Sequence, residues 1–519
     1  MSVESSPEHA SAVELSDRVI DGAKVARVMG TIAIAISFAF AAGLEHLLAT
    51  ANLEADGGIM LRALSTPSGE VSNPRRAIVL LVDGLRADEA RALPSLRAWP
   101  GVKGSLRTEL PSLSRPFYHL LLTGVPTDAS GVRTNRFDGH ARHDSIADRV
   151  REAGGRFLLC AQGIDYFRTM FAEPGDRTLV APDALGPGLD AMLAELARAP
   201  APSLLLVHHT EVDQSAHDSG IASARHQAAL READSIIARL LSSRGDAALI
   251  VLSDHGHLAA GGHGGPEPEV TRAPLFVTAG APLELEGSVP APALAATIAS
   301  WLGTSAPAAA TRGPWAPLAG PGASVARVEG QRDALARAGA AAARRRLEGR
   351  RSFWTPLAVL FALMTLGPIK RAFRLDRGAL AAIASWPLAV AALHLLTGRP
   401  FSLSAIDTRL AHGVRVALLG LGACLVAWAI GLWLARGERA SRVRRVLAST
   451  AWAATAAGLA SGLWVGFELG PWPLSSTQHY LPMYVFACAA VATLASGAGL
   501  WLASSSRLVN ETAATERGA

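Results

Sequence analysis

A small set of carboxylates, imidazoles and one serine stands in short motifs between residues 83 and 265 of this 519-residue chain. Aspartate oxygens combined with histidine nitrogens are ligands for zinc or manganese, and histidine favours zinc. A serine hydroxyl is a poor nucleophile at neutral pH unless a base or a metal activates it. These residue types therefore predict metal-dependent nucleophilic chemistry. The candidates are Asp83, Ser114, Asp213, His217, Asp254, His255 and His263.

Each motif has a more ordinary interpretation when it is taken alone. A pair such as Asp83-Gly84 is usually a turn, and an aspartate with a histidine four residues on, as in Asp213 and His217, usually forms a solvated helix face. His263 stands in the glycine-rich segment 261–265, which has the composition of a loop. The prediction of a site therefore depends on all the motifs occurring together, in this order and after apolar runs.

Apolar runs alternate with helix-like stretches through this part of the chain. The runs are residues 77–82, 157–160, 203–208, 249–253 and 274–277, and the helix-like stretches include 146–153, 185–198 and 223–242. This alternation predicts an α/β fold with a mainly parallel sheet flanked by helices. Because chemistry gathers at the carboxyl ends of the strands in such sheets, we expect Asp83, Asp213 and Asp254 at one edge. Ser114 precedes the apolar run 117–122, whose helix N-terminus is expected to hold phosphate oxygens.

In this order the motifs resemble the alkaline phosphatase superfamily, in its type I phosphodiesterase/nucleotide pyrophosphatase branch, over about residues 75–280. The resemblance implies an alkaline phosphatase-like fold and two divalent metal ions, zinc or alternatively manganese. One ion is expected on Asp213, His217 and His263, and the other on Asp83, Asp254, His255 and the Ser114 oxygen. A phosphoryl-serine intermediate on Ser114 is implied as well. Asn135 falls where this branch has an asparagine on a phosphate oxygen, and Arg115 is a further candidate for contact with phosphate.

Two details favour one reaction within the superfamily. Residues 83–88 (DGLRAD) and 111–116 (PSLSRP) look like the corresponding motifs of the GPI ethanolamine phosphate transferases, whose layout of anchor, outer domain and several spans is also similar. This implies transfer of phosphoethanolamine from a phospholipid to a lipid-linked or glycan acceptor. The alternative is a phosphodiesterase or nucleotide pyrophosphatase that uses water. A sulfatase is less favoured because residues 114–118 lack the final arginine of the formylglycine motif, and a non-catalytic membrane scaffold is less favoured because the ligand set is complete.

Apolar blocks outside the motif region predict membrane insertion, since about 20 residues cross a bilayer. One block covers residues 28–50, and five follow at about 353–369, 379–397, 413–435, 446–469 and 481–503. The expected organisation is a cytoplasmic leader (1–27), an anchor (28–50), a linker (51–76), a catalytic domain (77–305), an Ala/Pro/Arg-rich juxtamembrane segment (306–352), a five-helix transmembrane domain (353–504) and a cytoplasmic tail (505–519).

The basic residues indicate topology and do not suggest a nucleic-acid partner, although the net charge is +5. They gather beside the apolar blocks, and the basic loops 370–377 and 436–445 are expected in the cytoplasm by the positive-inside rule. The catalytic domain is then extracytoplasmic, on the periplasmic side of a bacterial inner membrane. The expected partners are the membrane, a phospholipid or other phosphodiester donor, and a lipid or glycan acceptor.

Overall fold

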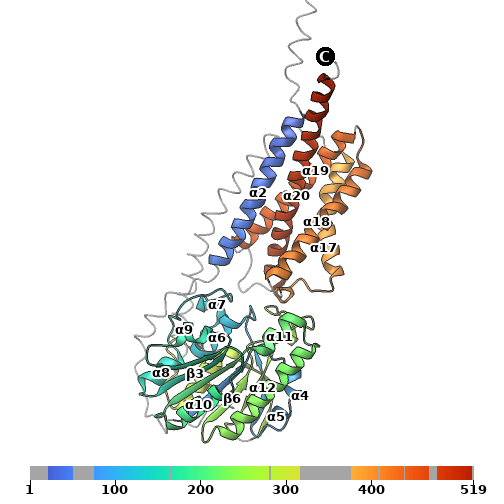
Figure 1. Cartoon of the computed structure of the whole chain (residues 1–519). Coiled ribbons are helices and arrows are strands. Elements are labelled where there is room, and N and C mark those ends of the chain that lie inside the picture. The colour runs from blue at the N-terminus through green and yellow to red at the C-terminus, as the bar shows by residue number, and fades with distance from the viewer. Residues whose placement is uncertain are drawn as a thin grey trace, which may run out of the picture.

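The computed structural model describes residues 22–50, 75–315 and 376–516, apart from positions 164, 280, 281, 407, 408, 438 and 467–475. An α/β domain lies at one end of a bundle of long helices (Figure 1). The predicted leader up to residue 21, most of the linker, the juxtamembrane segment beyond residue 315 and the predicted span 353–369 lie outside the described residues.

An eight-stranded sheet forms the centre of the α/β domain, in the order β4-β3-β5-β1-β6-β7-β2-β8. The strands are β1 (Arg76–Val82), β2 (Val102–Arg107), β3 (Arg156–Gln162), β4 (Arg177–Ala181), β5 (Ser203–His209), β6 (Ala248–Leu252), β7 (Arg272–Val277) and β8 (Leu283–Pro290). Strands β4, β3, β5, β1 and β6 are parallel, whereas β7 is antiparallel to both β6 and β2. The predicted α/β fold with a mainly parallel sheet is confirmed.

Both faces of the sheet are covered, which explains why its central strands are continuous apolar runs. Along β1, Ile78 and Leu80 pack into one core while Val79 and Leu81 pack into the other. Helices α6 (Ser114–Thr123), α8 (Ile146–Glu152), α9 (Tyr166–Phe171) and α14 (Leu294–Leu302) contribute to the core with Val79. Helices α4 (Ala87–Ala92), α5 (Pro94–Arg97), α10 (Gly186–Arg198) and α12 (Ala224–Ser243) contribute to the core with Ile78. The shorter elements α7 (Thr127–Ser130), α11 (Glu211–Ser219), α13 (Pro268–Thr271) and η2 (Ala291–Ala293) complete the domain.

The strand order brings the carboxyl ends of β5, β1 and β6 side by side. Val82 pairs with His209, and Leu81 pairs with Leu252. Asp83 follows β1, Asp254 follows β6, and α11, which carries Asp213, follows β5. The loop from β6 to β7 returns to the same edge with His263 because β7 is antiparallel to β6. The sheet therefore gathers the predicted site residues at one edge.

The helix bundle consists of α2 (Gly22–Thr50), α17 (Arg377–Leu396), α18 (Arg409–Leu434), α19 (Arg439–Gly466) and α20 (Ser476–Glu516), with a short η3 turn (Leu403–Ala405) between α17 and α18. The predicted anchor and four of the five predicted C-terminal blocks fall within these helices. Among the described residues, three stretches are long and apolar enough to cross a membrane, namely Arg377–Leu396, Leu410–Leu434 and Tyr484–Ser504. The structure therefore supports membrane insertion through α17, α18 and α20.

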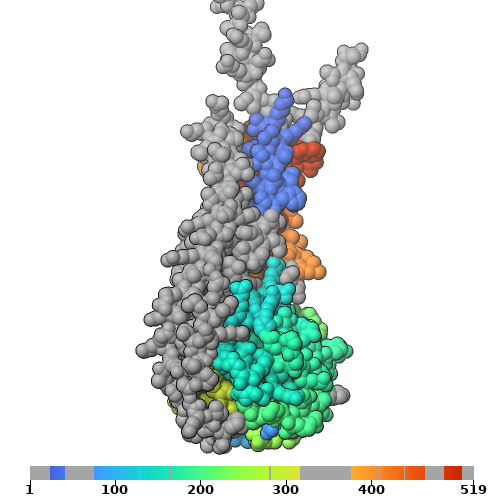
Figure 2. Space-filling model, turned by 90° about the vertical axis from the view of Figure 1, so that its left-hand side faces the viewer, coloured from blue at the N-terminus to red at the C-terminus, as the bar shows by residue number. Residues whose placement is uncertain are grey.

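Helix α2 packs lengthwise on α20 and is part of the bundle. Ser37 donates a hydrogen bond to the carbonyl of Ala490 at 2.7 Å. A Cβ on Gly30 would lie 2.7 Å from the carbonyl oxygen of Gly497, so the two backbones approach as closely as glycines allow. Figure 2 shows α2 in blue along the surface of the bundle, with the α/β domain in teal and green beneath.

Large apolar side chains cover the outward faces of α17 and α18. Leu388, Leu396, Leu410, Leu418 and Trp433 are all exposed. A continuous exposed apolar surface of this kind is typical of helices that contact lipid. The packing of the bundle therefore agrees with the hydropathy of its sequence.

Candidate metal centre and active site

The first candidate ligand cluster consists of Asp83, Asp254 and His255 at the ends of β1 and β6. The Nε2 atom of His255 lies 3.2 Å from Oδ2 of Asp254 and 3.5 Å from Oδ1 of Asp83. The other ring nitrogen, Nδ1, lies 3.2 Å from the carbonyl oxygen of Gly256, to which it can only donate. Nε2 of His255 then carries a lone pair. Together with Oδ1 of Asp83 and Oδ2 of Asp254, it offers three potential ligand atoms to a single ion.

The electrostatics of this cluster favour a bound cation. Oδ1 of Asp83 and Oδ2 of Asp254 are buried and have no hydrogen-bond donor. Burial, and then the charge of Asp213, raise the pKa of Asp83 to about 8. Burial, followed by the charges of Asp83 and Asp213, also raises the pKa of Asp254 well above its usual value. Two buried carboxylates that cannot both ionise without a counter-charge fit a divalent metal.

The second candidate cluster is formed by Asp213 and His217 of α11 together with His263. The Oδ1 atom of Asp213 lies 3.4 Å from Nε2 of His217 and 3.7 Å from Nε2 of His263. Nδ1 of His263 donates to the carbonyl of Ser112 at 2.9 Å, so its Nε2 presents a lone pair 3.1 Å from Nε2 of His217. The spacing of four residues on α11 therefore places both candidate ligand groups on one helix face.

The two clusters adjoin each other. The rings of His255 and His263 stack with centroids 3.5 Å apart and planes 10° from parallel. In each cluster the potential ligand atoms lie within 4.8 Å of one another. This arrangement is consistent with a binuclear metal centre and with the predicted division of the ligands. Burial lowers the pKa of His263 to about 3, so its imidazole is neutral at pH 7 and suited to bind a metal.

Ser114 lies beside the first cluster, at the first residue of α6. Its Oγ atom is 3.3 Å from Nε2 of His255, and the side chain is buried. The segment before it is anchored to the second cluster, since Ser112 Oγ accepts from the amide of Gly264 at 3.1 Å and donates to the carbonyl of Gly265 at 2.9 Å. One short segment therefore contacts both clusters and holds the predicted nucleophile next to the first.

The two predicted phosphate contacts have different surroundings. Asn135 Oδ1 accepts from the backbone amide of Arg115 at 3.0 Å, so the donor end of the Asn135 amide stays available close to Ser114. The Arg115 guanidinium lies over the ring of Tyr166, 3.7 Å from its centroid. The N-terminus of α6 also offers fewer free backbone amides to a phosphate than the sequence suggested. The amide of Arg115 already donates to Asn135, and Pro116 has no amide hydrogen.

Two residues that the sequence analysis did not assign to the site support Asp83. The Tyr118 hydroxyl donates to Oδ2 of Asp83, and His208 Nε2 lies 3.1 Å from the same oxygen. The Tyr118 ring stacks on Phe167 with centroids 4.3 Å apart. Tyr118 stands four residues after Ser114, and that helical spacing was the available signal for its presence.

His257 also contacts a ligand residue. Its Nδ1 accepts from the amide of Gly262 at 3.1 Å, so its Nε2 donates to Oδ1 of Asp213 at 2.8 Å. The imidazole thereby orients the carboxylate, as histidines and other groups around metal ligands commonly do. Burial alone raises the pKa of Asp213, but His217 and His257 outweigh burial and hold that pKa well below its usual value.

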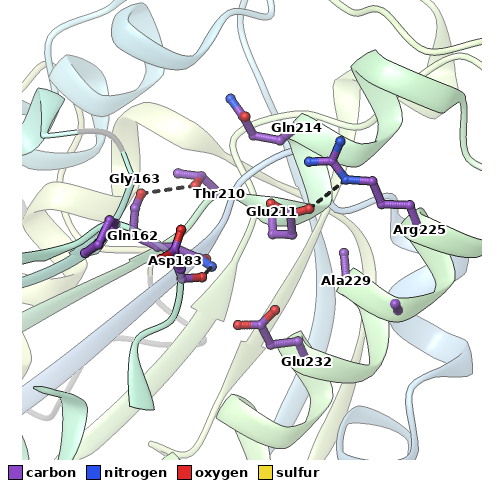
Figure 3. Close-up of a pocket in the computed structure, with 11 residues that line it drawn as sticks. Gln162, Gly163, Asp183, Thr210, Glu211, Gln214, Arg225, Ala229 and Glu232 are labelled. Carbon is purple, nitrogen blue, oxygen red and sulfur yellow. Dashed lines mark hydrogen bonds and ion pairs between the residues drawn. The ribbon is translucent and has the colours of Figure 1, made fainter. Parts of the chain in front are cut away.

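A polar pocket of about 500 Å³ lies on the other side of α11 (Figure 3). Its lining includes the carboxylates of Asp183, Glu211 and Glu232 and one guanidinium, that of Arg225. Arg225 pairs with Glu211 at 3.0 Å. Burial, and then the charge of Glu211, raise the pKa of Glu232. An excess of negative charge does not suit a phosphate group, so the pocket is not an alternative phosphate site.

Comparisons with known proteins agree with this geometry. The family model described as type I phosphodiesterase/nucleotide pyrophosphatase matches residues 166–263, a segment that contains all three residues of the second cluster together with Asp254 and His255. A search of curated proteins gives no match.

Several solved structures are similar to the α/β domain at low sequence identity. Murine ectonucleotide pyrophosphatase/phosphodiesterase 5, in an inactive form with AMP, is 14% identical with a TM-score of 0.38, and the match covers 45% of this chain and 96% of that chain. A 2-O GAG sulfatase is 13% identical with a TM-score of 0.39, covering 50% and 76%. A phosphonate monoester hydrolase of Agrobacterium radiobacter is 15% identical with a TM-score of 0.32, covering 50% and 82%.

The matched segment and the two ligand clusters together support a metal-dependent phosphodiesterase-type enzyme, and residues 166–263 are similar to the type I phosphodiesterase/nucleotide pyrophosphatase family. The predicted resemblance to the type I phosphodiesterase/nucleotide pyrophosphatase branch is supported over this segment. The finer resemblance to GPI ethanolamine phosphate transferases stays a prediction.

Proposed function

We propose that this protein is a membrane-anchored phosphotransferase that moves phosphoethanolamine from a phospholipid to a lipid-linked or glycan acceptor. The observation that carries the proposal is the position of Ser114 Oγ, 3.3 Å from the ligand nitrogen of a cluster with two unpartnered buried carboxylate oxygens. Helices α6 and α11, which carry Ser114, Asp213 and His217, lie at the end of the α/β domain that faces the apolar helices (Figure 1).

The residues fit two divalent ions, zinc or manganese. Asp83, Asp254 and His255 would hold one ion together with the Ser114 oxygen, and Asp213, His217 and His263 would hold the other. When bound, such ions stabilise the charge of a phosphoryl group and lower the pKa of a coordinated hydroxyl. Manganese is the alternative because carboxylate oxygens form part of each set, whereas the histidines favour zinc.

The reaction then proceeds by two successive displacements at phosphorus, with Ser114 as the nucleophile of the first and the leaving group of the second. Ser114 Oγ bonds to the phosphorus of the donor as the bond from phosphorus to the diacylglycerol oxygen breaks. Ser114 loses its hydroxyl proton, and the departing diacylglycerol oxygen gains one. In the second step an acceptor hydroxyl attacks the phosphorus and loses its proton, while Ser114 regains one as its bond to phosphorus breaks. Asn135 Nδ2 is placed to donate to a non-bridging phosphate oxygen, next to the start of α6.

The proposal is tested with purified full-length protein in mixed micelles with phosphatidylethanolamine. The expected products are diacylglycerol and a phosphoethanolamine adduct on Ser114, both dependent on zinc or manganese. The Ser114→Ala variant is expected to form neither, even at a saturating concentration of the metal. If wild-type protein loaded with either metal gave no diacylglycerol and no adduct, phosphoethanolamine transfer from phosphatidylethanolamine would be excluded.

A phosphodiesterase that uses water as the acceptor is the second candidate. The match of residues 166–263 to the type I phosphodiesterase family model favours it. Rapid turnover of a soluble nitrophenyl phosphodiester, with no dependence on an added alcohol acceptor, would favour hydrolysis over transfer.

A further inference from the structure

The loop between α17 and α18 packs directly on the glycine-rich loop that carries His263. The backbone amide of Gly265 donates to Ser404 Oγ at 2.9 Å, and the same hydroxyl donates to Oε2 of Glu267 at 2.7 Å. Ser402, Ser404 and Ala405 are all buried. The membrane region therefore does more than tether the α/β domain, since it contributes a buried contact two residues from a predicted metal ligand.

The glycines on either side of His263 are required by this contact. A Cβ on Gly262 would lie 2.1 Å from the carbonyl oxygen of Ser404, and a Cβ on Gly265 would lie 2.0 Å from Ser402 Oγ. A Cβ on Gly264 would lie 3.2 Å from Leu403 Cβ. Glycine at positions 262 and 265 is therefore explained by the close approach of the loop from the membrane region, whereas a Cβ on Gly261 would lie 2.4 Å from the carbonyl oxygen of Ala216 in α11.

The loop is fixed to the helices at its other side. The Arg415 guanidinium on α18 donates to the carbonyl of Ala405 at 2.7 Å. The ring of Phe401 stacks on that of His394 of α17, with centroids 4.0 Å apart. Ser402 Oγ accepts from the amide of Ser404 at 3.1 Å, which closes the turn. A continuous set of contacts therefore runs from α17 and α18 to the loop of His263.

The His263 loop is clamped from two directions. On one side, Ser112 of the nucleophile segment holds the amide of Gly264 and the ring of His263. On the other side, Ser404 holds the amide of Gly265. His263 is the one residue of the second cluster that does not come from α11, so its position relative to His217 depends on these two contacts.

We propose that Ser404 and Glu267 are positioning residues through which the membrane helices hold His263 in the second metal site. This inference rests on the proposed function, because it assigns a metal to that site. The α17–α18 loop then forms one wall of the metal centre, and the second site reaches its full metal affinity only when the loop is docked. Groups that orient metal ligands typically change metal affinity by about 10–100-fold.

The experiment uses the full-length protein in detergent micelles and two kinds of variant. Ser404→Ala removes the hydroxyl that links Gly265 to Glu267. Gly265→Ala keeps the serine but adds a Cβ that must displace the side-chain oxygens of Ser402, Glu267 and Ser404, which lie 2.0, 2.2 and 2.6 Å from its position. The matched control is Gly186→Ala at the start of α10, where a Cβ meets nothing within 4 Å. A second control is Thr397→Ala, which removes a hydroxyl that bonds only within the end of α17, to the carbonyl of His394 at 2.6 Å.

Two readouts separate this inference from the proposed function. Hydrogen exchange of peptides covering residues 258–268, measured on metal-free protein, reports docking of the loop, and peptides from β1 and β5 report that the sheet is intact. Zinc competition titration reports the affinity of the weaker site. For Ser404→Ala and Gly265→Ala we expect faster exchange in residues 258–268 and about 10-fold or greater loss of zinc affinity at one site. Both controls should match the wild type.

Wild-type exchange in both variants would overturn the inference, and so would faster exchange with unchanged zinc affinity. Failure of the proposed function looks different. In that case the wild-type protein binds zinc and its loop responds to the variants as expected, but phosphatidylethanolamine leaves no adduct on Ser114.

Discussion

The two ligand clusters are built by different parts of the chain. Asp83, Asp254 and His255 follow directly from the ends of two paired central strands, and their geometry is set by the register of the sheet. Asp213 and His217 lie on a helix, while His263 lies in a glycine-rich loop held by Ser112 and by the membrane region. The first cluster is therefore fixed by the core of the α/β domain, and the second depends on contacts that the domain does not supply alone.

This difference assigns different roles to the two clusters. Ser114, the proposed nucleophile, touches the first cluster, which is the more deeply buried, so changes there should affect the chemical step most. The second cluster is assembled from separate segments, so changes around it should act mainly on metal affinity. Variants of neighbouring residues can test this separation.

The largest contrast is expected between Ser114 and Ser112, two serines of one segment that serve different clusters. Ser114→Ala removes the proposed nucleophile and should lower kcat by about 1000-fold or more even at saturating zinc. Ser112→Ala removes the contacts to Gly264 and Gly265 and should weaken zinc binding by about 10–100-fold, with kcat largely recovered at saturating zinc. Steady-state kinetics over a zinc titration measures both. Equal losses of kcat at saturating zinc would contradict the division of roles.

Tyr118→Phe tests how firmly the first cluster is held. The variant keeps the ring that stacks on Phe167 but loses the hydroxyl that donates to Asp83. We expect zinc affinity at the first site to fall by about 10–100-fold with little loss of folding stability. Zinc competition titration together with thermal unfolding measures the effect. A large drop in melting temperature with normal zinc affinity would show that the hydroxyl serves the core and not the metal.

The pH dependence of stability tests the buried carboxylates of the first cluster. The folded-state pKa of Asp83 is raised to about 8 by burial and by Asp213, whereas the ordinary value is 3.8. Between these values the folded state binds the proton and the unfolded state does not, so stability falls as pH rises. Burial lowers the pKa values of His255 and His263 in the folded state. Their titration therefore raises the stability of the fold with increasing pH only up to about pH 6.5, the ordinary pKa of histidine.

Metal-free protein should therefore unfold at progressively lower temperature between pH 6.5 and about 8, because Asp83 then loses the proton that its carboxyl holds in the folded state. Zinc-loaded protein should lose this dependence, since the metal keeps the carboxylates ionised. Differential scanning calorimetry of both forms provides the comparison. A flat profile for metal-free protein would contradict the account of the first cluster as a site of unneutralised carboxylates.

The smallest effects are expected at the predicted phosphate contacts. Asn135→Ala should reduce kcat/KM by about 10-fold because a donor to the phosphate is lost. Arg115→Ala should reduce it less, because the guanidinium already lies on the ring of Tyr166. Kinetics with a soluble phosphodiester measures both variants. A larger effect for Arg115 than for Asn135 would indicate that the arginine leaves the ring when substrate binds.

The sequence predicted the buried central strands well but missed those nearer the edges. Strands β1, β5 and β6 are continuous apolar runs bounded by polar residues, and their burial on both faces makes the pattern unambiguous. Strand β2 contains Lys103 and Gly104, and the edge strand β8 alternates exposed charged residues such as Glu284 and Glu286. Neither segment has the composition of a buried strand, so only pairing with distant strands reveals them.

Most of the candidate ligand residues could be proposed from the sequence because they follow a strand or repeat along a helix, whereas His263 was proposed from its glycine-rich motif. The contacts that orient them lack such a signal, although the spacing of Tyr118 from Ser114 places both residues on one face of α6. Tyr118 and His208 meet at Asp83 across 90 residues of sequence, and Ser404 reaches Gly265 across 139. Contacts of this kind follow from tertiary packing and leave no periodic pattern in the sequence. The resemblance to a known superfamily supplied the ligand set, and the structure adds the means by which this chain holds it.

Intact-mass analysis of the zinc-loaded, full-length protein after brief incubation with phosphatidylethanolamine and an acid quench tests the central claim most directly. The account predicts a mass increase equal to one phosphoethanolamine group, located on the peptide that contains Ser114 and absent from Ser114→Ala. Protein that carries two zinc ions and turns over a phosphodiester, yet never holds a phosphoryl group on Ser114, would contradict it.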